Sequence, residues 1–580
     1  MKNTLKIVAA LSTVVTFAII GAEAARGQTA YPEAQIQGIG NWETEAIFTI
    51  GEEINGYRPT GILDGIGAFK LNDDTVRFLV NSELNDGTGY SYDINTLDGN
   101  PANDLTVPGG ARIHYFDVDI DSKEVIDGGL AFDRIFDRRG DLITDTSQFP
   151  TGASLNRFCS GMHVDAGTFG FVDDIYFAGE ETNGGTEFVL DVASIGSPQG
   201  GALYAAPALG RAAWENITPI DPGNPNQVAL LVGDDREAAA MYLYVGEKDT
   251  TAGAGFLERN GLAQGTLYTW VARNGDTTPT LGGFSTGSSV LGDWVPVVNI
   301  DPDTPDADDS DGFDSDGFAT QDGLDTQTGR AQALNSIQPG DSDNPTIIDG
   351  LTNLNAFLFS RPEDVATNPN DTTEIVMAST GRPGVFPEDS WGTTYSFKND
   401  LSTLTAEATV LYDGDVAPGF AGPDFGLRSP DNLDWADDGK IYIQEDRSIG
   451  AFCDTSDEEA SIWQLDPNNG NQLTRIAQMD RSVVVPTGVT DDDPTDCGDW
   501  ESSGILDVTE LFGSEERLFI LDTQAHSLRD GIIASEDLVQ GGQLIFLSES
   551  TSVPEPTSTL GLLALAGAVG AGTYGRKGKK

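Results

Sequence analysis

The sequence predicts an all-β fold, and three observations support this prediction. Short runs rich in Val, Ile, Tyr and Phe recur along the body of the chain, turns rich in Gly, Asp and Asn separate them, and long amphipathic helical patterns are nearly absent. Many short strands joined by polar turns are typical of a sandwich, a barrel or a propeller. The predicted strands cover residues 75–80, 111–117, 174–177, 227–232, 241–245, 266–271, 374–378, 440–444, 461–465, 518–521 and 543–547.

The ends of several predicted strands favour the propeller with irregular loop insertions. Each ends at a small polar or acidic cluster, and the spacing between clusters is irregular. If these are equivalent inner strands, their ends meet at one mouth of the central channel and gather many carboxylates there. The alternative is that strands commonly end at acidic turns. The clusters are 81–83, 179–181, 233–235, 444–446 and 522–524.

The net charge limits the classes of partner. The chain has 580 residues and a formal net charge of −60. A field of this sign argues against general binding to nucleic acid or to anionic lipid, whose phosphates are also negative, and it favours cations. The chain has only three His residues, which excludes a His-rich metal site. No Ser-His-Asp set, zinc-binding His pair or phosphate-cradling Gly loop is visible.

Residues 1–24 have the pattern of a Sec-type signal peptide. Two lysines precede an apolar run over 7–20, and Ala22-Glu23-Ala24 fits an Ala-x-Ala cleavage site. The apolar run is short for a membrane span. We therefore expect cleavage near Ala24 and export of the rest of the chain, with a retained N-terminal anchor as the alternative.

Residues 553–580 combine three features in a fixed order. Val553-Pro554-Glu555-Pro556 is followed by an apolar run over 560–574 and by a basic tail, as the positive-inside rule requires of a membrane segment. Together they resemble the PEP-CTERM sorting signal. The resemblance implies processing by an exosortase-type enzyme and a place in the cell envelope, anchored through the membrane or released after processing. An ordinary C-terminal membrane anchor is the alternative.

The three cysteines divide into a pair and a single residue. Export places the chain in an oxidising compartment, where paired cysteines tend to form disulfides. Cys453 and Cys497 share one acidic, loop-rich region, so we predict a bond between them. Cys159 is then left over, either as a buried apolar thiol or as a metal ligand.

An acidic insertion covers residues near 301–350. It consists mainly of Asp, Gly, Ser, Thr and Pro, and 308–312 and 314–317 look like fragments of calcium loops. Neither fragment has the ligand register of an EF-hand. A solvated acidic loop and adventitious calcium binding both stay open for this segment.

Four motifs carry residues suited to metal and phosphate chemistry. They are Arg157-Phe158-Cys159-Ser160-Gly161 with Gly179-Glu180-Glu181, then Gly233-Asp234-Asp235-Arg236-Glu237, then Arg361-Pro362-Glu363-Asp364, then Pro430-Asp431-Asn432 with Gln444-Glu445-Asp446. In this order they resemble the PhoX-type alkaline phosphatases, and 61–68 and 79–83 resemble the opening blade of that family. The resemblance runs from about residue 46 to about residue 547.

The resemblance implies a six-bladed β-propeller over residues 31–550, with iron and calcium at the mouth of its channel. It implies that Arg361 holds phosphate and that the metal ligands are Cys159, for iron, with Glu180, Glu181, Asp234, Asp235, Glu237 and Glu363. The chemistry agrees, because carboxylates suit calcium, a thiolate among carboxylates favours a transition metal, and an arginine can bind two phosphate oxygens.

The implied function is an exported, metal-dependent phosphomonoesterase that releases phosphate from small organic esters. Two departures from the family pattern bear on this function: residues 161–166 replace a Trp-containing segment, and Ser82 stands where the family has His. Two alternatives stay open. One is a non-catalytic, calcium-binding propeller of the surface or matrix, and the other is a calcium-dependent phytase-like or phosphodiesterase propeller.

Overall fold

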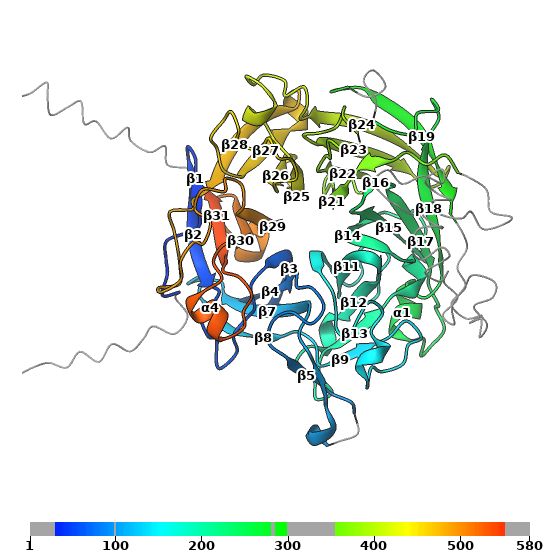
Figure 1. Ribbon diagram of the computed structural model, residues 1–580. Helices are drawn as coiled ribbons and strands as arrows, with labels where there is room; N and C mark the ends of the chain where they lie inside the picture. Colours follow the sequence, from blue (N-terminus) through cyan, green and yellow to red (C-terminus); the bar gives the residue numbers. More distant parts are fainter. Residues whose placement is uncertain (1–28, 98–99, 280–284, 298–353, 385, 551–580) are drawn as a thin grey trace, which may run out of the picture.

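The computed structural model describes residues 29–97, 100–279, 285–297, 354–384 and 386–550. The predicted signal peptide (1–24), the insertion near 301–350 and the sorting segment (553–580) lie outside these residues. The described chain is an all-β propeller whose strands are arranged around a central axis (Figure 1), so the predicted fold class is confirmed. All eleven strands predicted above are strands of the structure.

The strands follow one another around the channel in antiparallel groups. The groups are β3 (Leu63–Asn72), β4 (Thr75–Ser82), β7 (Arg112–Asp119) and β8 (Val125–Leu130); β9 (Arg134–Phe136), β10 (Phe158–Val164), β11 (Ile175–Gly185), β12 (Glu187–Asp191) and β13 (Ala202–Ala205); β14 (Ala212–Ile220), β15 (Gln227–Asp234), β17 (Tyr242–Glu247), β18 (Gly265–Ala272) and β19 (Ser289–Pro296); β21 (Pro362–Thr367), β22 (Glu374–Ser379), β23 (Thr393–Asp400) and β24 (Thr405–Asp413); β25 (Pro430–Trp435), β26 (Ile441–Glu445), β27 (Ser461–Asp466) and β28 (Gln472–Met479) with β1 (Ile36–Gly38); and β29 (Glu501–Asp507), β30 (Leu518–Gln524) and β31 (Gln543–Glu549) with β2 (Trp42–Thr49).

Short elements decorate these groups. They are the ribbons β5 (Tyr92–Ile94) with β6 (Leu105–Val107) and β16 (Glu237–Ala239) with β20 (Phe359–Ser360), and the helices α1 (Phe256–Arg259), α3 (Thr509–Phe512) and α4 (Gly531–Ser535). Pairing of β11 with β14 and of β19 with β24 joins neighbouring groups into one long sheet. Hydrogen bonding therefore does not divide the ring into separate blades, and the blade count of six stays a prediction.

The innermost strands contact one another in a closed ring. Within the described residues, β3 contacts β10, and the contacts continue through β14, β21, β25 and β29 back to β3. None of these strands was among those predicted from the sequence. Their sequences are interrupted by Gly, Asp, Asn and Pro, which break up the Val-, Ile-, Tyr- and Phe-rich runs that identify a strand.

Each innermost strand carries a β-bulge at the same place in its pairing with the next strand outward. Three residue steps along the inner strand lie opposite two steps along its neighbour. In β3, for example, Leu63 pairs with Ser82 of β4 and Ile66 pairs with Val80. The other bulges lie at 158–161, 214–217, 362–365, 430–433 and 503–506. A bulge bends the strand and re-aims its side chains.

The two ends of the described chain are tied into neighbouring sheets. β1 pairs with β28, and β2 pairs with β31 along its whole length, so segments from opposite ends of the sequence close the ring. The buried ring of Trp42 packs against Tyr442 and Phe519, with centroids 5.9 and 6.1 Å away. This closure makes the positions of the inner strands mutually dependent.

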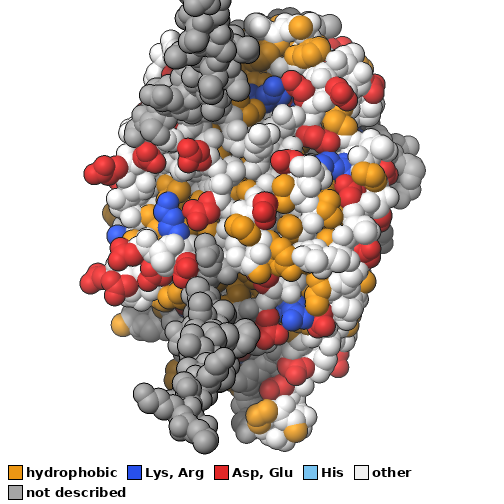
Figure 2. Space-filling view, turned by 90° about the vertical axis from the view of Figure 1, so that its left-hand side faces the viewer, with side chains coloured by type: hydrophobic (Ala, Val, Ile, Leu, Met, Phe, Trp, Pro, Cys, Tyr) orange, Lys and Arg blue, Asp and Glu red, His pale blue; other side chains and the backbone are white. Residues whose placement is uncertain are grey.

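The surface reflects the composition. Acidic side chains are spread over the face in Figure 2, with few lysines and arginines between them. No helix among the described residues has the length and apolar character needed to cross a membrane.

Candidate metal centre

The candidate site lies at the mouth where the innermost strands begin. In the sequence, the acidic clusters fit the ends of inner strands. Four of them instead lie at the end of a second strand, in β4, β15, β26 and β30, and the cluster 179–181 lies within β11, where its pairing with β12 ends. Because inner and second strands are antiparallel, the start of one lies beside the end of the other, as Phe158 lies beside Glu180. The clusters therefore gather at the same mouth as the bulges.

Four overlapping groups of metal-ligating side chains surround this mouth. In each group the ligand atoms lie within 4.8 Å of one another. Cys159, Glu215 and Asp431 each belong to two groups, so each can bridge neighbouring cations. The groups are Asp64, Glu83 and Cys159; Cys159, Glu181 and Glu215; Glu215, Glu363 and Asp431; and Asp431, Asp446 and Glu501. We call this set the mouth ring.

The bulges explain why the ligands converge. In five of the inner strands the first bulged residue belongs to the mouth ring: Asp64, Cys159, Glu215, Glu363 and Asp431. The second bulged residues, Gly65, Ser160, Asn216, Asp364, Asn432 and Ile505, line a channel cavity of about 180 Å³. Five of the six bulges thus contribute one side chain to the mouth ring and the next residue to the channel wall.

Burial and crowding raise the proton affinity of several carboxyl groups of the mouth ring. Burial raises the pKa of Glu181 from its usual value near 4.5 to about 7, against the opposing effect of Arg157. The pKa of Asp64 and that of Glu215 are raised well above the usual range, first by burial and then by the neighbouring Glu83 and Glu363. Such crowding of acids at close range is relieved by bound cations. The residues present therefore fit a cluster of metal ions.

Cys159 adds a soft ligand to this set. Its Sγ donates to a carboxylate oxygen of Glu181 at 2.9 Å, and burial raises the pKa of the thiol well above the usual value. A thiolate among carboxylates suits a transition metal better than calcium, and binding such a metal displaces the thiol proton.

Two arginines stand on the rim beside the mouth ring. Arg157 and Arg361 directly precede β10 and β21, and both have left-handed backbone conformations, with φ of 50° and 69°. This conformation is unfavourable for a side-chain-bearing residue and is typical of functional sites. It places both guanidinium groups among acids: Arg157 contacts Glu83 and Glu181, and Arg361 binds Asp235 through Nε at 2.7 Å and Nη2 at 2.8 Å.

The pairing with Arg361 decides the charge of Asp235. Burial alone would raise the pKa of this carboxyl, but Arg361 holds it below the usual range. Nη2 of Arg361 also lies 2.9 Å from Glu363. Asp235 is therefore an anion that orients the arginine, and it lies outside the four metal-ligating groups.

The structure brings only part of the sequence-predicted set together. Cys159, Glu181 and Glu363 belong to the mouth ring, and Arg361 with Asp235 lies beside it. Glu180 accepts main-chain N–H groups of Asn156 and Thr186, both at 3.1 Å, and Asp234 accepts that of Ala213 at 3.1 Å. These two side chains pack within the strand groups, since neighbouring strand residues point to opposite sides. Glu237 lies in β16, whose main chain pairs with β20.

Several residues of the mouth ring were not predicted as ligands. They are Asp64, Glu83, Glu215, Asp431, Asp446 and Glu501, together with Arg157 beside them. A usable signal was present in the sequence. An acid or Cys followed by Gly, Ser, Asn or Asp opens the bulge of five inner strands, in the pairs Asp64-Gly65, Cys159-Ser160, Glu215-Asn216, Glu363-Asp364 and Asp431-Asn432.

Comparison with known proteins relates this sequence to one family. The sequence profile of the family described as alkaline phosphatase PhoX matches residues 188–485, which is 298 of the 580 residues. The chain belongs to the PhoX family. The matched segment contains Glu215, Asp235, Arg361, Glu363 and Asp431, whereas Cys159 precedes it. No curated protein sequence matches the chain.

A solved structure shows the same fold as this member of the PhoX family. PhoX of Pseudomonas fluorescens, solved in complex with vanadate, a transition state analogue, aligns with a TM-score of 0.54 and 14% identity over 90% of this chain and 97% of that chain. A Synechocystis apocarotenoid oxygenase variant aligns with a TM-score of 0.30 and 12% identity, over 90% of this chain and 96% of that chain. The second similarity is too low to carry an argument.

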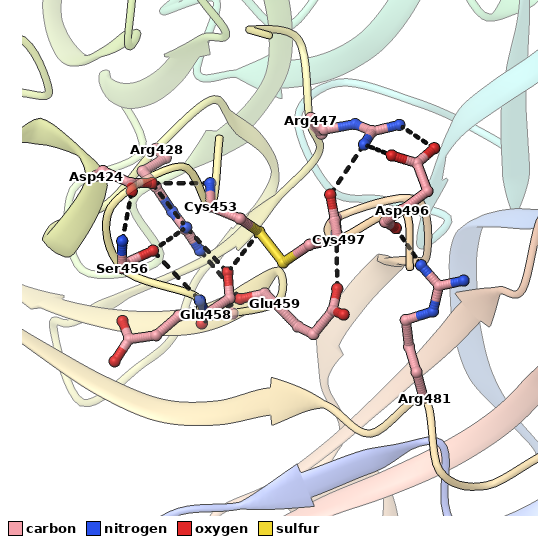
Figure 3. The surroundings of a disulfide bond; sticks show 12 residues. Asp424, Arg428, Arg447, Cys453, Ser456, Glu458, Glu459, Arg481, Asp496 and Cys497 are labelled. Atoms are coloured by element: carbon pink, nitrogen blue, oxygen red, sulfur yellow. Dashed lines mark hydrogen bonds and ion pairs between the residues drawn. A yellow bond between two sulfur atoms is a disulfide. The ribbon is translucent and has the colours of Figure 1, made fainter. Parts of the chain in front are cut away.

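A disulfide, which we call the brace, joins two chain segments that adjoin residues of the mouth ring. Figure 3 shows the surroundings of this bond. Cys453 and Cys497 are bonded, whereas Cys159 is a free, buried thiol. Beside the bond, Arg447 pairs with Asp496 at 2.5 Å and donates to the carbonyl of Cys497 at 2.9 Å. Arg447 directly follows Asp446, and Cys497 lies four residues before Glu501. The brace therefore connects the chain segments that carry these two acids.

The first prediction concerns stability and pH. A carboxyl whose pKa is raised by folding stabilises the protein while protonated, and this contribution is lost as pH rises through the raised pKa. Glu181 alone, moving from about 4.5 to about 7, would cost on the order of 3 kcal/mol. We expect the unfolding temperature of metal-stripped protein to fall between pH 5 and 8, and that of calcium-loaded protein to fall much less. Thermal unfolding monitored by circular dichroism measures both.

A matched pair of variants separates this effect from general charge repulsion. Glu215→Gln should flatten the pH dependence of the stripped protein, because it removes one crowded carboxyl. Glu407→Gln changes an exposed acid of β24 and should leave the slope unchanged. Equal slopes in the two variants would show that the mouth ring does not cause the effect.

The second prediction concerns the brace. Replacing both bridged cysteines, in Cys453→Ser with Cys497→Ser, should weaken calcium binding and lower the unfolding temperature, since a 44-residue cross-link is worth roughly 4 kcal/mol in the chain-entropy estimate. A double variant is preferable to a thiol reductant, which would itself bind metal. Calorimetric titration with Ca²⁺ measures the affinity.

Arg447→Ala supplies the comparison, because it removes the contacts to Asp496 and Cys497 and leaves the disulfide in place. Weakened calcium binding in both proteins would support the prediction that the disulfide and the contacts of Arg447 hold the calcium ligands in place. Unchanged affinity in the double-cysteine variant would rule it out.

Proposed function

We propose that this protein is a metal-dependent phosphomonoesterase. The observation that carries the proposal is the mouth ring with two arginines beside it, in a chain of the alkaline phosphatase PhoX family. Anionic ligands would hold cations there, and the cations with the arginines would neutralise a phosphate group in a protein whose overall charge repels it.

The donor sets divide between two kinds of metal. The groups that contain Cys159 combine a thiolate with carboxylates and suit iron, whereas Asp431, Asp446 and Glu501 offer oxygen alone and suit calcium. When bound, such ions neutralise phosphate oxygens and make a water-derived nucleophile available near neutral pH. Iron and calcium are part of this proposal.

Arg361 is the proposed phosphate-binding residue. Asp235 and Glu363 engage its Nε and Nη2, which fixes the plane of the guanidinium group. Within the described residues Nη1 makes no hydrogen bond, so it is the donor left for a phosphate oxygen. An arginine held in this way loses little conformational entropy when the substrate binds.

Arg157 is a second cation beside the mouth ring. Its Nε donates to Glu181 at 2.8 Å, and its Nη2 lies 3.8 Å from Sγ of Cys159. It thus offsets the negative charge of the groups proposed to hold iron. We assign it the role of positioning Glu181 and Cys159.

We also propose export to the cell envelope with processing at both ends. The support is the sequence of residues 1–24 and 553–580, which the structure does not describe. Mass spectrometry of protein recovered from the envelope or medium should give a mature N-terminus near Ala24 and a C-terminus upstream of the basic tail. Recovery of the intact chain in the soluble interior of the cell would refute the proposal.

The third prediction tests the activity. Purified protein loaded with iron and calcium should hydrolyse a phosphomonoester such as p-nitrophenyl phosphate, and vanadate should inhibit it. Arg361→Lys keeps the charge but loses the planar fork, so we expect kcat/KM to fall roughly 100-fold or more. Cys159→Ser should lose both activity and bound iron. Steady-state kinetics and elemental analysis measure these effects.

The control is Arg273→Lys, which changes an exposed arginine paired with Asp293 and should keep full activity. Substrate choice separates the alternatives. Turnover of phytate or of a diester with calcium alone would indicate a phytase-like or phosphodiesterase propeller, and calcium binding with no turnover would indicate a structural protein of the surface. Full activity in both Arg361→Lys and Cys159→Ser would overturn the site assignment.

A further inference from the structure

A second group of metal-ligating side chains lies at the far end of β10. It consists of His163 near the end of β10, Asp165 just beyond it, and Asp174 just before β11, and the three ligand atoms lie within 4.8 Å of one another. His163 is four residues from Cys159, about 13 Å along a strand at 3.3 Å per residue. This group is thus separate from the mouth ring.

The imidazole of His163 is fixed in position, but one of its nitrogens makes no hydrogen bond within the described residues. The ring of His163 stacks on Phe69 of β3, with centroids 4.9 Å apart. Its Nε2 is shielded from solvent and makes no hydrogen bond within the described residues. Burial lowers the pKa of this imidazole, against the effect of the two aspartates, and so favours the neutral form that binds metals.

The charges of the two aspartates of this group are not compensated by an ion pair within the described residues. Asp174 is oriented by the main-chain N–H of Ala166, which donates to its Oδ1 at 2.8 Å. The adjacent Asp173 is neutralised by Arg259 at 2.5 Å, whereas no ion pair within the described residues neutralises Asp165 or Asp174. The cluster therefore combines a fixed nitrogen donor with two uncompensated carboxylates.

We propose that His163, Asp165 and Asp174 form a binding site for a divalent transition-metal ion such as Zn²⁺. One nitrogen and two carboxylate ligands suit such an ion better than calcium, which prefers oxygen alone. Tetrahedral zinc with bonds of about 2.0 Å separates its ligands by roughly 3.3 Å, so a small movement of the solvent-exposed Asp165 completes the site. Water supplies the fourth ligand.

The site joins the two strands that carry Cys159 and Glu181. β10 and β11 pair from Val164 beside Ile175 to Phe158 beside Glu180. A metal ion bound by residues from both sides of the connection between them would hold this hairpin closed at the end opposite the mouth ring. The residues involved lie in and near segment 161–166, where the sequence departs from the family pattern.

The test is zinc stoichiometry in the full-length, iron- and calcium-loaded protein, measured by elemental analysis after equilibrium dialysis against buffered Zn²⁺. Asp165→Asn and His163→Gln should each bind one Zn²⁺ fewer per chain than the wild type. Asp221→Asn, an exposed acid outside every metal-ligating group, should match the wild type. Because Asp165 is exposed, its variant should fold even if His163→Gln does not. Equal zinc content in the wild type and Asp165→Asn would overturn the proposal.

Pulsed electron paramagnetic resonance of Cu²⁺-loaded protein identifies the donor. The mouth ring contains no His, so a coupling to imidazole nitrogen reports on one of the chain's three histidines. The coupling should vanish in His163→Gln and persist in His526→Gln, which removes the imidazole that lies 3.8 Å from Glu501. The reverse pattern would assign the metal to the mouth and overturn the proposal.

Discussion

The bulge at the start of each innermost strand is the constraint on which the site depends. A regular strand would send successive side chains to alternate sides, so two neighbouring residues could not both face the axis. The extra residue in the bulge allows Cys159 to face the mouth while Ser160 faces the channel, and the same holds for Glu363 and Asp364. Repeated around a closed ring of strands, this local irregularity produces a cluster of ligands from segments far apart in the sequence.

The closed ring of strands also holds acidic side chains close together despite their mutual repulsion. Acids such as Glu215 and Asp431 are forced together by strands that cannot separate without breaking the pairing of β2 with β31. This protein and PhoX of Pseudomonas fluorescens share the fold at 14% sequence identity. The arrangement of strands therefore persists while most side chains change. Two arginines offset part of the repulsion, and protonation or bound cations must offset the rest.

The sequence was most informative where the chain is regular. The second and outer strands contain the runs rich in Val, Ile, Tyr and Phe, and all eleven strands predicted from these runs are present. The inner strands could not be found in this way, because Asp64-Gly65 or Asp431-Asn432 reads as a turn when the bulge that requires it is unknown. Three of the four motifs of the PhoX resemblance contribute residues to the mouth ring. They could not show that Glu181 belongs to the mouth ring and Glu180 does not. This depends on which alternate residues of β11 point toward the mouth.

The strand β10 shows how a change in one segment can add chemistry without disturbing the fold. Its first residues are fixed by the mouth, where Cys159 contacts Glu181 and Arg157, and its last residues only have to connect to β11. Pairing with β11 and packing of His163 on Phe69 hold that far end in register, so the connection is free to vary in sequence. Placing a nitrogen ligand and two aspartates there costs little, because solvent hydrates the exposed Asp165 until a cation binds. A propeller strand therefore has two ends that can evolve separately, one bound to the shared centre and one able to acquire a site of its own.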